Sequence, residues 1–403
     1  MVSPDATLWD VIVVGGGPAG STLAALVSAA GHRVLVLDKE PFPRFHIGES
    51  LLPLCLPVLQ RLGVEPDPQS WVYKRGAQFV CEASSRQRAF DFADALPGPP
   101  RHAWQVERAA FDLQLSARAR ECGTEVRHDV KVAGVELGPD GVEVRGREGG
   151  VRLRARYLVD ASGQNRLLAR HHQSAEPILH FGRTAAFIHH DGLGPAAIEE
   201  IGEGNDIRIM ISEHGWGWLI PLAGGRLSVG LVCREGQVAA RALESFVAES
   251  PIIGRWTRGC SASEVRLERN FSYVNRRPHG QRFVCVGDAA CFLDPVFSSG
   301  VSLAMVGAQS AADRLSSALS DGTEDDPALM APHQAHMEQG YHAFSSMIDR
   351  FYNTRFVEHF IFGPQADGAF QREIVSVLAG DVWRTDSRFQ DMLTRSRRAA
   401  KAS

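Results

Sequence analysis

A lysine within the stretch SWVYKRGAQF, residues 70–79, is the first residue whose type suggests a particular chemistry. The chain contains 43 lysine and arginine residues, and the only lysines are Lys39, Lys74, Lys131 and Lys401. Burial lowers the pKa of a lysine and makes its neutral, nucleophilic amine accessible, whereas a guanidinium stays protonated. Lys74 is therefore a candidate for chemistry that arginine cannot perform, and a plain surface lysine is the alternative.

Two tryptophans alternate in the stretch GWGWLIPL, residues 215–222. On a strand, residues two apart point to the same face, so Trp216 and Trp218 are expected to present both indoles to one side. Only seven of the 403 residues are tryptophan, and the pair is followed by Ile220 and Pro221, which completes the pattern W-x-W-x-I-P. The alternative is a pair of core aromatics without a chemical role.

The segment that must position such groups begins near the N-terminus, where a strand at 10–14 precedes an Ala/Leu-rich helix that reaches about residue 30. A second strand follows and ends at Asp38. Glycines in the spacing G-x-G-x-x-G let the backbone approach a pyrophosphate, and the helix N-terminus offers it free N–H groups. Asp38 can accept hydrogen bonds from a ribose. The expected contacts of this loop are Gly15, Gly17, Pro18, Ala19 and Gly20. Both NAD and FAD fit this motif.

Two later segments decide between these cofactors. Residues 156–166, RYLVDASGQNR, read as a strand and a small-residue turn, and residues 281–315 read as a strand, the pair Gly287-Asp288 and a long helix. They resemble the FAD contacts of the large family that includes aromatic hydroxylases, geranylgeranyl reductases and flavin-dependent halogenases. In that family the aspartate, here Asp288, holds the ribityl chain. A helix cap is the alternative role for Asp288.

The segments RFHIGESLLPLCLP, residues 44–57, and QVERAAFD, residues 105–112, are also similar to segments of that family. The resemblance implies that FAD is the cofactor and that further residues lie beside it. These residues are Asp38, Lys39, Arg44, Glu49, Ser50, Gln105, Arg108, Asp160, Gly287 and Asp288.

The lysine and tryptophan motifs together resemble those of the flavin-dependent halogenases. Their segment G-F-x-x-K-x-G-A-x-F is matched around Lys74, except that Ser70-Trp71 replaces Gly-Phe. The resemblance implies that reduced FAD, dioxygen and chloride or bromide give hypohalous acid, which Lys74 relays to the substrate. It also implies that Trp216 and Trp218 shield the flavin, and that the backbone amides of Ser299 and Gly300 bind the halide.

The substrate implied by this resemblance is an electron-rich ring. Tryptophan halogenases carry a glutamate just before the Ser/Thr-Gly pair, and Phe297 stands close to that place here. A pyrrole or phenol bound to an acyl or peptidyl carrier protein is therefore expected, with a flavin reductase supplying reduced FAD. The alternatives are a geranylgeranyl-reductase-like or hydroxylase enzyme and a non-catalytic flavoprotein on the same fold.

The composition is that expected of an ordinary soluble protein: the formal net charge is −4 and the pI is about 6.4. Neither value favours binding to nucleic acid or to an anionic membrane. The seven cysteines form no C-x-x-C pair, so we expect reduced thiols and no metal. No signal peptide or membrane span is recognised, which predicts a cytoplasmic protein.

The predicted fold class is α/β, an FAD-binding Rossmann-like domain like that of aromatic hydroxylases. Its predicted pieces are residues 1–80, 101–170 and 275–330. A mixed β-sheet substrate domain is expected from 81–100 and 171–274, with strands at 207–212, 216–222, 226–233 and 263–270. A helical region is expected over 331–403, with helices at 329–362 and 369–398.

Overall fold

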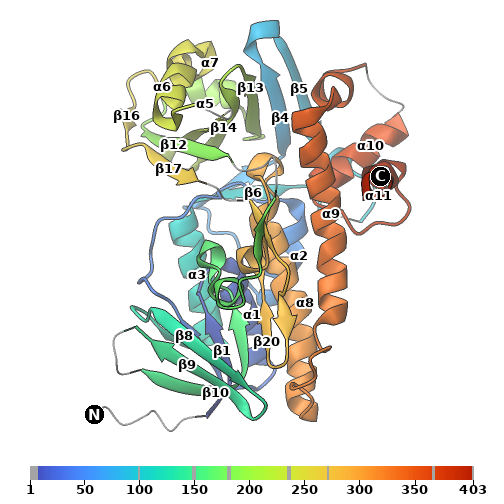
Figure 1. Cartoon of the computed structure of the whole chain (residues 1–403). Helices are drawn as coiled ribbons and strands as arrows, with labels where there is room; N and C mark the ends of the chain where they lie inside the picture. Colours follow the sequence, from blue (N-terminus) through green and yellow to red (C-terminus); the bar gives the residue numbers. More distant parts are fainter. Residues whose placement is uncertain are drawn as a thin grey trace.

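The computed structural model describes residues 8–98, 100–147, 151–178, 183–233, 237–269, 272–364 and 368–401. Two large sheets, one toward each end of the molecule in Figure 1, are joined by crossing segments and flanked by the long helix α9. The predicted α/β class, with a Rossmann-like domain, a second mixed sheet and a helical C-terminal region, is confirmed.

The first sheet has the strand order β19-β20-β10-β1-β2-β7. Its central strand β1 (Leu8–Val14) is parallel to β2 (Val34–Leu37) and β10 (Arg152–Asp160), and β7 (Glu125–Arg127) and β20 (Phe283–Cys285) extend it in parallel. The short strand β19 (His279–Gly280) adds an antiparallel edge. The strands β1, β2 and β20 are apolar runs because both faces of the sheet are covered.

The two faces of this sheet are covered differently. Val11 and Val13 pack into the cluster formed with α1 (Pro18–Ala29), α3 (Arg108–Glu121) and α8 (Ser299–Asp321). Ile12 and Val14 face the antiparallel strands β8 (Val132–Gly138) and β9 (Gly141–Gly146), so successive residues of β1 alternate between the two layers. The β-meander over 126–160 is thereby confirmed, with Gly141 at its tight turn.

The second sheet has the order β16-β12-β15-β14-β13-β4-β5, and β17 also pairs with β12. Its strands are β4 (Gly76–Cys81), β5 (Arg86–Asp91), β12 (Thr184–Asp191), β13 (Ile207–Ser212), β14 (Gly215–Leu222), β15 (Arg226–Cys233), β16 (Ser261–Ala262) and β17 (Arg266–Arg269). On one face, β12 and β13–β15 pack with helices α5 (Pro195–Ile201), α6 (Ala239–Glu249) and α7 (Pro251–Trp256). The predicted strands at 207–212, 216–222 and 226–233 are confirmed. The strand predicted at 263–270 is β17, and residue 270 lies outside the described residues.

Smaller elements connect the two sheets. They are α2 (Leu56–Leu62), α4 (Leu167–His171), the pair β3 (Trp71–Lys74) and β6 (Ala103–Val106), and the three strands β11 (Ala175–Pro177), β18 (Tyr273–Asn275) and β21 (Cys291–Phe292). Because β4 pairs with β13 in the second sheet, the chain crosses between sheets at residues 75–76, five residues before the predicted boundary at 80.

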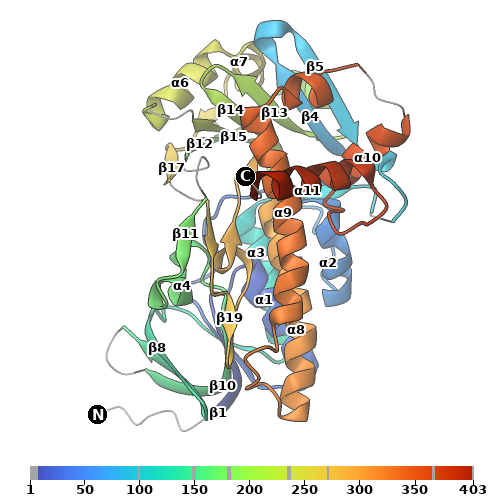
Figure 2. The same cartoon turned by 45° about the vertical axis from the view of Figure 1, so that its right-hand side comes forward.

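The C-terminal region consists of α9 (Ala331–Asn353), a π-helical turn (Val357–Ile361), α10 (Gly368–Leu378) and α11 (Arg388–Lys401). The prediction of one helix over 369–398 is wrong, because the chain turns after α10 at Gly380, whose φ is 97°. Helix α9 runs alongside α8 (Figure 2), and its buried Phe344 and Met347 join the core cluster that contains both motif tryptophans.

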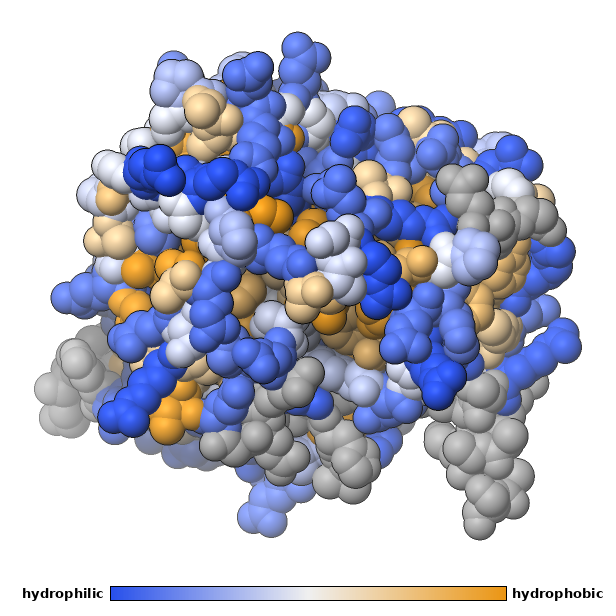
Figure 3. All heavy atoms as spheres, turned by 90° about the horizontal axis from the view of Figure 1, so that it is seen from above, coloured by the Kyte–Doolittle hydropathy of each residue, from blue (hydrophilic) through white to orange (hydrophobic). Residues whose placement is uncertain are grey.

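The surface carries mostly hydrophilic side chains. Seen from above, apolar side chains show mainly in recesses between charged ones (Figure 3). Within the described ranges, every helix is too short or too polar to cross a bilayer. All seven cysteines are free thiols.

Candidate active site

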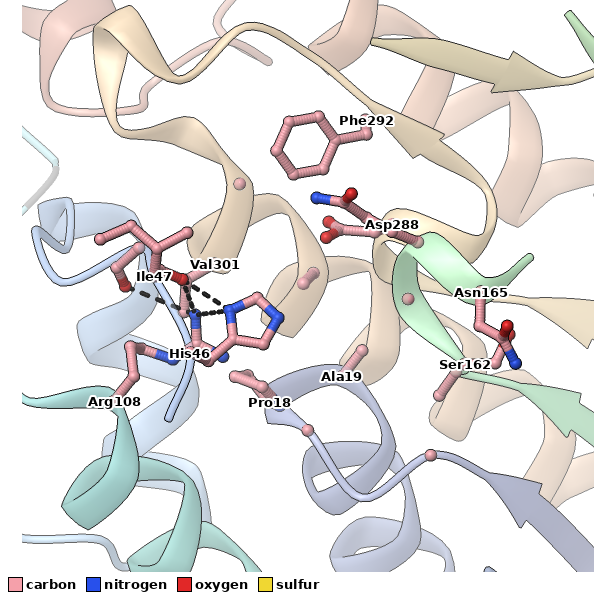
Figure 4. Close-up of a pocket in the computed structure, with 18 of the residues that line it drawn as sticks. Pro18, Ala19, His46, Ile47, Arg108, Ser162, Asn165, Asp288, Phe292 and Val301 are labelled. Atoms are coloured by element: carbon pink, nitrogen blue, oxygen red, sulfur yellow. Dashed lines mark hydrogen bonds between the residues drawn. The ribbon is translucent and has the colours of Figure 1, made fainter. Parts of the chain in front are cut away.

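A cavity of about 520 Å³ lies between the two sheets and is lined by both. The first sheet contributes the turn after β1, the segment 37–50 and the turn after β10. The second contributes the apolar residues Ala185, Phe187, Ile207, Trp216, Trp218 and Ile220. In Figure 4, His46, Arg108 and Pro18 lie on one side of the cavity, and Asp288 and Phe292 lie on the other.

The turn between β1 and α1 can be built only with glycine at two positions. Gly15 has φ 103°, and a Cβ there would lie 2.2 Å from the carbonyl oxygen of Ala161. A Cβ at Gly20 would lie 1.9 Å from the carbonyl oxygen of Gly15, so this residue packs helix against strand. Gly17, Pro18 and Ala19 line the cavity at the N-terminus of α1. This open, positively polarised helix end fits the pyrophosphate of FAD.

Full charges surround this helix end. Asp38 accepts hydrogen bonds from the N–H of Gly16 at 2.7 Å and of Glu40 at 3.0 Å. Arg44 lies 3.8 Å from Asp38 and 3.6 Å from the buried Asp112. The buried Nε of Arg44 has no hydrogen-bond partner among the described residues. This unpaired cationic donor lies beside the glycine turn, where it can make a charge-assisted hydrogen bond to an anionic cofactor.

Asp112 also holds Arg108, through two hydrogen bonds of 2.8 and 3.0 Å. Arg108 donates another to the carbonyl of Ile47 at 2.7 Å, and the Nδ1 of His46 lies 2.7 Å from the same oxygen. Burial, and then the positive charge of Arg108, lower the pKa of His46 to about 4. The ring is therefore neutral, its Nδ1–H donates to Ile47, and its Nε2 is an acceptor.

Asp288 faces this group across the cavity (Figure 4). Burial raises the pKa of Asp288 to about 7, and the charge of Arg108 opposes that shift. A carboxyl group so easily protonated can either accept or donate a hydrogen bond, which suits the ribityl hydroxyls of FAD. Asp288 and Arg108 were predicted from the sequence as residues beside the cofactor, whereas His46 and Asp112 were not. The segment RFHIGES quoted for the resemblance contains His46, so that signal was available.

Most residues expected beside the cofactor line the cavity. They are Gly15, Gly17, Pro18, Ala19, Asp38, Lys39, Arg44, Glu49, Ser50, Arg108 and Asp288. Gly20, Gln105, Asp160 and Gly287 stand behind its wall. Asp160 accepts hydrogen bonds from the N–H groups of Ser162 and Leu168, and Gln105 donates one to Asn205. These residues shape the wall and do not themselves face the cavity.

The second sheet forms an aromatic wall of Phe187, Trp216 and Trp218, whose neighbouring rings are 6.0 and 6.1 Å apart. The indole of Trp218 lies over Gly230 on the adjacent strand β15, where a Cβ would come within 2.0 Å of the ring. Its Nε1 donates to the hydroxyl of Ser228 at 3.1 Å. The missing side chain at 230 therefore lets Trp218 lie flat on the sheet.

Glu49, in the segment 37–50, contacts the strand that carries part of this aromatic wall. Its Oε1 lies 2.7 Å from the Nε2 of His189, which shares a strand face with Phe187. Phe45 stacks on Phe187 with ring centres 6.0 Å apart. Sequence analysis missed His189 and Phe187, because nothing in the local pattern of β12 distinguishes them from core residues.

Lys74 is buried, with 1% of its surface exposed. Its Nζ donates hydrogen bonds of 2.8 Å to the hydroxyl of Ser50 and of 2.8 Å to the carbonyl of Leu51. Burial lowers the pKa of Lys74 to about 7, against the opposing effects of Cys55 and Asp206. Lys74 does not line the cavity itself. Ser50, whose hydroxyl accepts the hydrogen bond of this amine, does line the cavity.

The expected halide loop lies where the chain enters α8. Ser298, in the left-handed conformation with φ 56°, and Gly300 line the cavity, whereas Ser299 is buried. Phe297 is buried as well and packs edge-on against Phe351 at 5.9 Å. It therefore points into the core, away from the cavity.

Fold and cavity together define an FAD-binding α/β enzyme. The family model described as tryptophan halogenase matches residues 10–98 and 81–360. A flavin-dependent halogenase of Armillaria mellea is 31% identical over 83% of this chain and 72% of its own length. A 1H-pyrrole-2-carbonyl-[peptidyl-carrier protein] chlorinase of Pseudomonas fluorescens is 30% identical over 93% and 90%.

Solved structures agree with these sequence relatives. The flavin-dependent brominase Bmp2 has a TM-score of 0.83 and 25% identity, with coverage of 98% of this chain and 100% of its own. A flavoprotein/dehydrogenase from Cytophaga hutchinsonii has a TM-score of 0.87 and 28% identity over 98% of both chains. The chain belongs to the tryptophan halogenase family of FADH2-dependent halogenases, and its cofactors are FAD and a halide.

Proposed function

We propose that this halogenase acts on a pyrrole or phenol ring held by an acyl or peptidyl carrier protein, and that Lys74 relays the oxidised halogen. The observation that carries the proposal is the buried amine of Lys74, which is hydrogen-bonded to Ser50, a residue that lines the cavity. Reduced FAD, supplied by a separate flavin reductase, would provide hypohalous acid from dioxygen and halide when bound.

The environment of Lys74 supports this role. With a pKa near 7, its amine and ammonium forms are both populated at neutral pH. The ammonium can hold hypohalous acid by a hydrogen bond. Alternatively, the amine attacks the halogen, forms an N–halogen bond and releases water. In either case a ring carbon then takes the halogen and the ring loses a proton, which leaves Lys74 unchanged.

The substrate class is supported by the aromatic wall and by the relatives. Phe187, Trp216 and Trp218 give an apolar surface on which an aromatic ring can stack. The similarity to a halogenase named for a carrier-bound pyrrole extends over 93% of this chain. With Phe297 packed into the core, the loop offers no glutamate to the substrate, which favours a ring activated by its own heteroatom.

The proposal is tested with purified protein, FAD, a flavin reductase with NADH, dioxygen, and either chloride or bromide. Pyrrolyl carrier protein and free phenols are offered, and the expected products show the chlorine or bromine isotope pattern by mass spectrometry. Lys74→Ala is expected to lose product while reduced FAD is still oxidised. Lys74→Arg, which keeps the charge and lacks the amine, separates the two routes: loss of product favours the N–halogen bond, and retained product favours a hydrogen bond from the cation.

Two results would contradict parts of this proposal. Halogenation that persists in Lys74→Ala would exclude the relay role and leave the halogenase assignment standing. A product that forms without halide and gains only oxygen or hydrogen would instead support the second candidate, an oxidoreductase like the Cytophaga hutchinsonii flavoprotein/dehydrogenase.

A further inference from the structure

Three distant segments meet in a chain of hydrogen bonds behind the aromatic wall. The Nε1–H of Trp216, in β14, donates to the hydroxyl of Tyr352 at 2.7 Å. The hydroxyl of Tyr352, near the end of α9, donates in turn to Oδ2 of Asp294 at 2.7 Å. The two contacts span 136 and 58 residues of sequence, so only the tertiary fold brings the three side chains together.

Asp294 connects this chain to the expected halide loop. Its other oxygen, Oδ1, accepts the N–H of Val296 at 3.1 Å and so caps the 3-10 turn Pro295–Phe297. Ser298 and Gly300 follow that turn directly and line the cavity. The carboxylate is fully buried, with 0% of its surface exposed. One side chain therefore holds the entry to the loop and, through Tyr352, the indole of Trp216.

The charged and titratable groups facing Asp294 come from two elements besides its own. Tyr352 reaches it from α9, and Arg183, at the start of β12, lies over the Tyr352 ring at 4.0 Å. Burial raises the pKa of Asp294 to about 6. The hydrogen bonds from Tyr352 and Val296, the charge of Arg183 and a direct interaction with Trp216 oppose that shift. The carboxylate is thus held ionised at neutral pH by its contacts.

We propose that Tyr352 is a positioning residue that locks Trp216 and the halide loop into one arrangement, so that oxidised halogen passes to Lys74 and does not escape. The proposal rests on the proposed function, because escape is defined by that reaction. Its physical basis is the cost of leaving buried polar groups without partners, which makes one arrangement of the three side chains strongly preferred.

Tyr352→Phe is the sharpest variant. It keeps the ring packed against Phe351 and Arg183 and removes only the hydroxyl that serves both hydrogen bonds. We expect the halogenated product formed per reduced FAD oxidised to fall about tenfold, the factor that one buried hydrogen bond can supply. Free hypohalous acid, trapped by taurine, should rise in step. FAD affinity and the rate of FAD oxidation should stay within about twofold.

Tyr157→Phe is the matched control. Tyr157 is also a buried tyrosine, but its hydroxyl has no partner among the described residues. Its replacement should leave product yield, trapped oxidant and FAD affinity unchanged. If the loss of any buried hydroxyl lowered the product yield, both variants would show the decrease. The proposed role predicts a decrease only in Tyr352→Phe.

Two readouts separate positioning from packing. In wild-type protein the product yield per FAD should fall as the pH drops through about 6, where Asp294 takes up a proton. In Asp294→Asn the yield should be low and should lack this step, while any change near pH 7 that comes from Lys74 or Asp288 stays. The tryptophan emission should also shift in Tyr352→Phe relative to wild type, and this shift should vanish in a Trp216→Phe background, since the other six tryptophans are common to both.

The outcomes distinguish this inference from the proposed function. If wild-type protein gives no halogenated product, the proposed function fails, and the emission measurement still tests the contact. If wild-type protein halogenates and Tyr352→Phe keeps both its yield and its emission spectrum, the positioning role is overturned.

Discussion

The two ends of the cavity are built by different physical means. At the nucleotide end, Gly15 and Gly17 bring backbone close to the ligand, and Asp38 and Arg44 supply full charges. At the ring end, aromatic side chains provide an apolar surface, and the buried Lys74, hydrogen-bonded to the cavity-lining Ser50, is an amine that burial makes easy to neutralise. The first end binds a permanent anion, whereas the second must handle an electrophile and a ring.

The two ends also differ in how far apart in the sequence their residues lie. The residues of the turn after β1 and Asp38 all lie within residues 9–40. The ring end draws Phe187 from β12, the tryptophans from β14, Ser50 from the cofactor segment and Lys74 from β3. A substitution at one end should therefore leave the other largely intact, and the predictions below test that separation.

The largest effect is expected at the nucleotide end. Gly15→Ala places a Cβ about 2.2 Å from the Ala161 carbonyl oxygen and strains a residue with φ 103°. We expect the free energy of unfolding to fall by more than about 4 kcal/mol and FAD binding to be lost. Urea unfolding and the quenching of flavin fluorescence measure the two effects.

Gly254→Ala, in α7, is the control, because a Cβ there meets nothing within 4 Å in the described part of the chain. It should change stability by no more than about 1 kcal/mol, in the stabilising direction. Wild-type FAD affinity in Gly15→Ala would contradict the conclusion that backbone proximity builds this end.

The next effect concerns Lys74 and its dependence on pH. The pKa of Lys74 is about 7 in the folded protein, against an ordinary value of 10.5. Between these values the unfolded chain binds one more proton than the folded chain, so stability rises with pH across this window. The contribution of Lys74 to this rise should approach about 5 kcal/mol, and the raised pKa values of buried cysteines oppose it near the upper end of the window. Lys74→Met should abolish it, and urea unfolding between pH 6.5 and 10 measures the slopes.

Lys131→Met serves as the comparison, since Lys131 is exposed. This variant should keep the slope of the wild type. Parallel slopes for Lys74→Met and wild type would show that the amine is not desolvated in the folded protein, and the proposed relay would lose its physical basis.

The features that could be predicted from the sequence are those that depend on residues close together in the chain. The strand–glycine–helix unit and the tryptophan strand were predictable, because each depends on residues a few positions apart. Tyr352 was not, because it acts on partners that only the tertiary fold supplies. Asp112 pairs locally with Arg108, four residues earlier on the same helix, but its contact with Arg44 depends on the tertiary fold. Gln105 and Asp160 show what a motif position does not predict. Motif position predicts that such residues lie near the cofactor, but it does not show whether the side chain faces the cavity or supports its wall.

A smaller effect is expected from the ring end. Gly230→Ala puts a Cβ about 2.0 Å from the indole of Trp218, which must then leave its place on the sheet. Overpacking of this kind costs about 1–3 kcal/mol of stability. Product yield per reduced FAD should fall sharply while FAD affinity is unchanged, as mass spectrometry and flavin fluorescence can show.

Gly134→Ala, on β8, is the matched strand variant, because its Cβ would have 3.7 Å to its nearest neighbour. It should leave the product yield per reduced FAD unchanged. If Gly230→Ala weakened FAD binding as much as halogenation, the two ends could not be treated as separate.

The smallest effect tests whether the halide site belongs with the ring end at all. Ser298 adopts the left-handed conformation, with φ 56°, at the start of α8. Ser298→Gly relieves strain of about 1 kcal/mol and adds a similar entropy to the unfolded chain, so stability should change by less than about 1 kcal/mol. If backbone amides bind the halide, the chloride KM should also stay constant. A several-fold increase in that KM would instead assign the halide to the serine hydroxyl. A constant KM would mean that backbone amides at a helix N-terminus bind an anion at both ends of the cavity: the pyrophosphate at the nucleotide end and the halide at the ring end.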